Sequence, residues 1–193
     1  MNVPIRIRAL IAAVLMAAGI SAVAALPASA APNSVCALNQ PASATRSFAH
    51  PGNNTSAWAS PFGHVPDDIF RFTATGSTQI QPVFGAWKPP SGDVNDIAWP
   101  DQGYWPRTGV PKFALLMRIT SGTAHWVTSA NHAHDPAVVA GSRLEPFKWY
   151  YAGAVSDCVK LENPAASSFQ FVVNDANVFD NSGGPTVTAR QWW

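Results

Sequence analysis

The sequence predicts an all-β fold, an antiparallel β-sandwich of jelly-roll type. Only 12% of the 193 residues are charged, about half of the globular average, so long helices with charged surfaces are not expected. The 17 prolines, 13 glycines and 8 tryptophans are typical of many turns that join short strands. With 47% hydrophobic residues and no convincing amphipathic helix, the chain is neither disordered nor a coiled coil. A jelly roll closes a core from such strands.

Residues 1–31 are expected to be a secretory signal peptide. Two arginines precede a mostly apolar run at residues 9–25, and Ala28-Ser29-Ala30 is a cleavage signature. The alternative is an uncleaved membrane anchor, which Pro27 and the polar interruptions of the run disfavour. We therefore expect a secreted protein with one β-sandwich domain over residues 32–193.

The charge balance limits the partners. Removal of the leader takes away two of the 12 lysines and arginines and none of the 11 acidic residues. The mature chain then carries a net charge of −1, because ten basic residues face eleven acidic ones. We therefore expect it to bind neither nucleic acid nor an anionic membrane.

Seven segments are predicted to be strands, because turn residues bound most of them. In the first, Phe70 and Phe72 alternate with smaller or polar residues, as one buried face requires. The sixth alternates in the same way through Phe169 and Phe171. The third is more continuously apolar, as in a central strand; a short helix is the alternative. The segments are residues 68–75, 79–87, 112–120, 124–129, 144–152, 167–174 and 185–191.

Two long loops are expected, at residues 131–143 and 153–166. The only two cysteines, Cys36 and Cys158, most simply form one disulfide in an exported protein; the alternative is two free buried thiols. Because Cys158 lies in the second loop, the disulfide is expected to hold that loop in place.

The segment of residues 173–184 is rich in oxygen-bearing side chains. Asp175, Asp180 and Asn181 lie within one short loop, which can also turn backbone carbonyls inward. Such oxygens suit Ca²⁺, which takes about 6 to 8 oxygen ligands. The spacing is not that of an EF-hand. The alternative is an ordinary hairpin loop, because Asp, Asn, Ser and Gly are the usual turn residues.

A second segment, residues 99–106, combines aromatic rings with an acid and an amide. Such a surface suits sugars, because rings pack on the apolar face of a pyranose while Asp101 and Gln102 bind its hydroxyls. The alternative is that Trp99 and Trp105 are buried anchors of the loop.

Three blocks, in order, resemble the PA-IL-like family of calcium-dependent galactophilic lectins. They are Pro100-Asp101-Gln102-Gly103, then residues 114–119 with Ser121-Gly122, and then Asn174-Asp175 followed by Asn181-Ser182-Gly183. The resemblance covers roughly residues 68–191 and implies a galactose-binding-like jelly roll. It also implies that Ca²⁺ bridges protein oxygens and two sugar hydroxyls.

The resemblance implies a role for each matching residue. Asp175 is the principal carboxylate ligand, and Asp180 and Asn181 add side-chain oxygens. Backbone carbonyls come from Asn177 or Val178, and from near Gln79 or Ile80. Gln102 and its neighbour Pro100 match the sugar-contacting positions. Three features depart from the family: Trp99 replaces a histidine, Asp180 an asparagine, and the calcium loop is about two residues shorter.

Enzyme readings have weaker support. His132, His134 and Asp135 suggest a zinc site without a further identifiable ligand; a solvated loop is the alternative. No G-x-S-x-G elbow occurs, a disulfide would consume both cysteines, and no acidic pair is assigned for glycoside hydrolysis.

We therefore expect a secreted calcium-dependent carbohydrate-binding protein of galactose type, whose avidity an oligomer would raise. One alternative is a β-sandwich with a purely structural calcium site that binds a protein partner. A secreted hydrolase with an unrecognised site is the other.

Overall fold

The computed structural model describes residues 32–58, 63–81, 84–163 and 168–193, and the predicted signal peptide lies outside these residues. The described residues are mostly β-strands in antiparallel sheets, so the predicted all-β class is confirmed. Their α-helical content is α1 (Pro32–Ala37). None of the described helices is long and apolar enough to cross a membrane.

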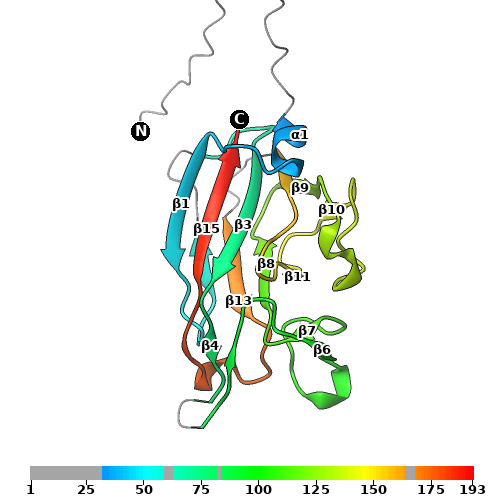
Figure 1. Ribbon diagram of the computed structural model, residues 1–193. Coiled ribbons are helices and arrows are strands. Elements are labelled where there is room, and N and C mark those ends of the chain that lie inside the picture. Colours follow the sequence, from blue (N-terminus) through cyan, green and yellow to red (C-terminus); the bar gives the residue numbers. More distant parts are fainter. Residues whose placement is uncertain (1–31, 59–62, 82–83, 164–167) are drawn as a thin grey trace, which may run out of the picture.

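Two main sheets lie face to face (Figure 1). The larger has the order β1 (Ala44–Ala49), β15 (Thr186–Trp192), β3 (Ile69–Thr75), β12 (Val159–Asn163), β9 (Thr123–Trp126) and β10 (Arg143–Leu144). The smaller has the order β11 (Tyr150–Tyr151), β8 (Leu115–Ile119), β13 (Phe169–Val173) and β2 (Ser56–Trp58).

Aromatic side chains from both sheets form the centre of the core. Phe72 of β3 packs against Phe169 and Phe171 of β13, with ring centroids 4.7 and 5.0 Å apart. Phe70 lies 5.2 Å from Phe169 in the same cluster. All four are almost fully buried, and burial of each such side chain stabilises the fold by about 1.5–3 kcal/mol. The predicted alternation in these two strands is therefore confirmed.

Three predicted strands are wrong in extent. Segment 112–120 is divided into β7 (Pro111–Lys112) and β8, because Phe113 between them has a φ of 62°. Such a left-handed conformation interrupts an extended strand. Segment 144–152 is divided between β10 and β11, which belong to different sheets. Segment 79–87 contains only parts of β4 (Thr78–Gln79) and β5 (Trp87–Lys88).

These short strands build two small sheets. β4 lies between β5 and β14 (Ser182–Gly183), and β7 pairs with β6 (Asp93–Ile97). Figure 1 shows β4, β6 and β7 toward one end of the sandwich, opposite α1 and the C-terminus. The segments predicted to bind calcium and sugar connect to these small sheets.

The predicted disulfide between Cys36 and Cys158 is confirmed, but its predicted setting is wrong. Residues 153–166 are not one long loop, because β12 occupies their middle and lies between β3 and β9. Cys158 directly precedes β12, and both cysteines are buried with Ile69 and Trp192. The disulfide therefore ties α1 to the larger sheet.

Candidate functional site

The predicted calcium loop connects β13 to β14 through the short 3-10 turn η3 (Val178–Asp180). It lies at the end of the sandwich that carries β4 (Figure 1). Asp175 stands two residues after the end of β13, and Asn181 directly precedes β14. The two residues are therefore held by strands on both sides of the loop.

Two oxygens of this loop are buried without a hydrogen-bond donor among the described residues. They are Oδ2 of Asp175 and Oδ1 of Asn181. Asp175 is 7% exposed and Asn181 is 4% exposed. The other oxygen of Asp175 accepts from the backbone N–H of Asn177 at 3.0 Å. A buried polar atom without a partner costs about 1–3 kcal/mol, so both oxygens fit a cation that would bind them.

The loop's other predicted ligands are partly engaged with each other. The Asn177 amide donates to Oδ2 of Asp180 at 2.7 Å. The backbone carbonyl of Asn177 accepts from the Asp180 N–H at 3.2 Å, and that of Val178 from the Asn181 N–H at 3.3 Å. A carbonyl oxygen has two lone pairs, so each retains capacity for a further ligand.

Ile80, the other predicted carbonyl ligand, follows β4 in the small sheet. In the small sheet, Ser182 of β14 is paired with Gln79 of β4. Continuing this antiparallel register by one residue puts Asn181 opposite Ile80. The Ile80 N–H donates to the Ala86 carbonyl at 3.1 Å, and a Cβ atom on Gly85 would stand 1.1 Å from the Ile80 carbonyl oxygen. The predicted carbonyl ligand therefore faces the connection between β4 and β5 rather than the calcium loop.

The predicted sugar-binding segment forms the short turn η1 (Pro100–Gln102). Pro100 and Gln102 are exposed, and Trp99 is 54% exposed. The side-chain carbonyl of Gln102 accepts from the backbone N–H of Trp99 at 3.4 Å. The NH₂ of the same side-chain amide is therefore the group that can donate to a ligand. The alternative of a buried anchor therefore applies to the partly buried Trp105, which packs against Phe113, rather than to Trp99.

The sugar-binding segment and the calcium loop lie against each other. A Cβ atom placed on Gly103, directly after η1, would stand 3.1 Å from the Cβ atom of Ala176. Ala176 directly follows Asp175. The structure thus joins the two segments that the sequence had marked separately.

Asn174 holds this junction, a role that the sequence did not reveal. Asn174 is fully buried. Its Oδ1 accepts from the backbone N–H of Arg107 at 3.1 Å, and its Nδ2 donates to the Pro111 carbonyl at 3.0 Å. Residues 107–111 are therefore fastened directly beside Asp175. The Asn-Asp doublet was visible in the sequence, but nothing local indicated which distant backbone the asparagine contacts.

Residues 50–52 close the other side of the loop. The Asn181 amide donates to the Gly52 carbonyl at 3.2 Å, and the Gly52 N–H donates to the Gly183 carbonyl at 2.7 Å. Nearby, His50 is almost fully buried, and burial lowers its pKa to about 4. No sequence motif marked this segment.

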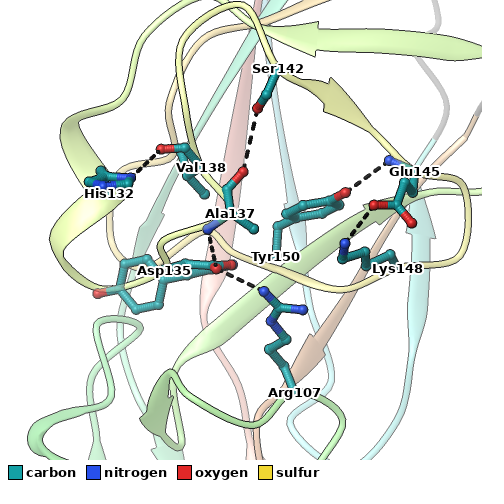
Figure 2. A network of polar contacts seen from close by, with 10 residues as sticks. Arg107, His132, Asp135, Ala137, Val138, Ser142, Glu145, Lys148 and Tyr150 are labelled. Atoms are coloured by element: carbon teal, nitrogen blue, oxygen red, sulfur yellow. Dashed lines mark hydrogen bonds and ion pairs between the residues drawn. The ribbon is translucent and has the colours of Figure 1, made fainter.

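The histidine segment considered for zinc is part of a structural network (Figure 2). Asp135 is fully buried and accepts hydrogen bonds from Arg107, Ala137 and Tyr151 at 2.9–3.1 Å. His132 contacts the Val138 carbonyl through Nδ1 at 3.2 Å. The part of the chain that the structure describes contains no group of three or more His, Cys, Asp or Glu residues suited to a metal. A calcium site in the loop between β13 and β14 would therefore depend on amide and carbonyl oxygens as well as on carboxylates.

Comparison of the chain with protein-family models, with curated proteins and with solved structures found no match. The likeness to the calcium-dependent lectins therefore rests on the three sequence blocks. The geometry around Asp175 and Asn181 is an independent observation.

Proposed function

We propose that this protein is a secreted, calcium-dependent carbohydrate-binding protein of galactose type. The observation that carries the proposal is the pair of buried oxygens, Oδ2 of Asp175 and Oδ1 of Asn181, that lack donors. None of the described residues donates to them, and a hard cation would satisfy both. The strands alternate between the two main sheets along most of the chain, which supports the jelly-roll topology as part of this proposal.

Each residue of the site has a defined task in this proposal. Asp175, Asp180 and Asn181 would hold Ca²⁺ through side-chain oxygens, together with the backbone carbonyls of residues 177–178. The bound cation would supply positive charge to which two neighbouring sugar hydroxyls bind.

The sugar-binding segment would fix the orientation of the ring. The Gln102 amide donates to a hydroxyl, and the exposed indole of Trp99 packs on the apolar face of the pyranose. The function is binding without turnover.

Calorimetry tests the proposal in two steps. The metal-stripped mature protein is titrated with Ca²⁺ and then with galactose, for the wild type and for Asp175→Asn. We expect the wild type to bind Ca²⁺ and to bind galactose only when Ca²⁺ is present, and the variant to bind neither. A matched control is Asp67→Asn, which removes an exposed aspartate paired with Lys160.

Each other result has a clear meaning. Calcium binding without binding of any sugar would leave a structural site and favour the protein-partner alternative. Absence of calcium binding in the wild type would overturn the site assignment.

A further inference from the structure

A row of side chains across the smaller of the two main sheets places an arginine between an amide and an indole. Gln170 of β13 is paired with Arg118 of β8, and continuing the register of β8 with β11 by one residue puts Trp149 opposite Arg118. Met117 and Ile119, on either side of Arg118, belong to the core, so Arg118 points to the other face. Directly opposed residues share a face, and the whole row therefore lies on the outer face of the sandwich.

The guanidinium of Arg118 is fixed from several sides. Its central carbon lies 4.2 Å from the ring centroid of Trp149 and 5.7 Å from that of Phe147. Its Nε–H donates to Oε1 of Gln170 at 2.8 Å, and its Nη1 donates to the Phe147 carbonyl at 3.3 Å. A planar cation with these contacts keeps one orientation, which suits recognition of a planar anion.

The positive charge of Arg118 has no counter-ion within the part of the chain that the structure describes. No carboxylate there lies within 4.0 Å of it. Two of its five N–H groups have an acceptor among those residues, so both hydrogens of Nη2 are left for a ligand. Nη2 is not among the buried atoms without partners, so it reaches the surface. Partial burial lowers the pKa of Arg118, because desolvation disfavours the charged form, and a bound anion would offset this cost.

Phe147 presents an apolar ring beside this cation. Its φ of 63° lies in the left-handed region, which bulky residues rarely adopt, and its side chain is 63% exposed. Its N–H donates to the Ile119 carbonyl at 2.9 Å, and its carbonyl accepts from Arg118. Such strained conformations persist where the surroundings fix them, and they cluster at binding sites. The fold therefore keeps an exposed ring next to an unpaired guanidinium.

The combination suits a sugar that carries a carboxylate. A guanidinium binds a carboxylate through two parallel hydrogen bonds, and an aromatic ring packs on the apolar face of a pyranose. The NH₂ of the Gln170 side chain, which no described residue accepts from, can donate to a sugar hydroxyl. The neighbouring cation, Lys148, is paired with Glu145 (Figure 2). One unpaired cation matches a single carboxylate, whereas a polyanion such as nucleic acid requires several.

We infer that Arg118, Phe147 and Gln170 form a binding site for a uronic acid residue on the outer face of the smaller main sheet. Arg118 binds the carboxylate, Phe147 packs on the ring, and Gln170 donates to a hydroxyl. Gln170 stands five residues before Asp175, roughly 15 Å along an extended chain, so the site is separate from the calcium loop. It goes beyond the proposed function, because it recognises a charged sugar without calcium.

Calorimetry of the mature protein in chelator tests this inference without the calcium loop. The ligands are the methyl glycosides of galacturonic acid and glucuronic acid, each compared with its methyl ester, which has the same ring but no charge. We expect the wild type to bind at least one acid about tenfold more tightly than its ester, since a charge-assisted hydrogen-bonded pair contributes about that factor. Arg118→Gln should abolish the difference. Arg118→Lys should keep only part of it, because an ammonium lacks the planar fork.

Further variants separate recognition from effects on folding or net charge. Arg190→Gln is the matched control, because it removes an arginine of the larger sheet that binds Asn39, and it should leave the ratio of the two Kd values unchanged. Phe147→Ala should weaken the binding of acid and ester alike. Because Phe147 is exposed, this variant tests the site even if Arg118→Gln does not fold, which thermal unfolding of each variant shows.

Each other result has a definite meaning. Equal Kd values for acid and ester in the wild type, or a difference that survives Arg118→Gln, would overturn the site. An acetylated tripeptide with a free carboxylate that binds as tightly as the uronic acids would overturn the assignment to a sugar. Since calcium is absent from all of these titrations, failure of this inference and failure of the proposed function are independent results.

Discussion

Two aspartates of this protein are buried to a similar degree but accept different numbers of hydrogen bonds. Asp135 is fully buried and receives three donors, from Arg107, Ala137 and Tyr151, across its two carboxylate oxygens. Asp175 is 7% exposed and receives one backbone donor on Oδ1, while Oδ2 has none among the described residues. The comparison distinguishes a carboxylate whose two oxygens are hydrogen-bonded within the fold from one with an oxygen that receives no donor from the described residues.

The difference follows from the cost of burying charge. An ionised carboxylate taken out of water must be paired with a cation or hydrogen-bonded. At Asp135 the guanidinium of Arg107 supplies both a positive charge and a hydrogen bond. At Asp175 the described residues supply no cation, although the side chain is kept away from water. A bound Ca²⁺ would make the two sites equivalent in this respect.

The largest expected effect is the loss of stability in Asp135→Ala. The substitution leaves the partly buried Arg107 guanidinium without its carboxylate and two backbone N–H groups without an acceptor. We expect the free energy of unfolding to fall by about 4 kcal/mol, as for other broken buried ion pairs. Urea denaturation of the disulfide-bonded protein measures this. A loss below about 1 kcal/mol would show that the network in Figure 2 does not hold the fold.

A second group without a full set of partners lies near the calcium loop and should make stability depend on pH. Nε2 of His50 is buried with no partner among the described residues, and burial lowers the pKa of His50 from 6.5 to about 4. The unfolded chain therefore binds the proton first as the pH falls. The contribution of His50 to the free energy of unfolding is therefore fully present above pH 6.5. It falls progressively toward pH 4, by about 3 kcal/mol in all.

The variant His50→Asn isolates this contribution. We expect the difference in unfolding free energy between wild type and variant to change by about 3 kcal/mol between pH 7 and pH 4. A difference that stays constant over this range would mean that the histidine titrates normally in the folded protein.

Asp175→Asn should behave in the opposite way to Asp135→Ala. Without calcium, we expect no loss of stability, because a neutral amide is less costly to bury than a carboxylate with one donor. With free Ca²⁺ at about 30 times the Kd, the wild type should gain about 2 kcal/mol and the variant nothing. Urea denaturation in calcium and in chelator compares the two. A large fall in the unfolding free energy of Asp175→Asn in chelator would mean that Asp175, like Asp135, stabilises the fold without calcium.

The sequence revealed the strands whose inner face packs in the core, and missed those that are exposed or short. β3 and β13 were predictable because large apolar residues alternate along them. β1 was missed because it is an edge strand with mostly exposed residues, so its apolar alternation is weak. β12 was missed because its five residues lie among the turn residues that suggested a long loop.

The candidate site was predictable only where its residues are close in sequence. The oxygens of Asp175 and Asn181 lie in one loop, whose composition predicted either a cation site or an ordinary hairpin loop. Gly52 accepts from Asn181 across 129 residues, and Asn174 accepts from Arg107 across 67. Contacts of this range depend on the sheet topology, which no local pattern in a single sequence encodes.

The smallest expected effect concerns the exposed ion pair of Lys148 and Glu145, which sharpens the same comparison (Figure 2). Its N···O distance is 2.6 Å, against 2.9 Å for Arg107 and Asp135, and its hydrogen bond raises the pKa of Lys148. Both side chains are at least one-third exposed, so water screens the attraction. Lys148→Met should cost about 0.5 kcal/mol or less, and the cost should vanish at about 1 M salt. A loss comparable to that of Asp135→Ala would mean that distance, rather than burial and the number of donors, determines what an ion pair contributes here.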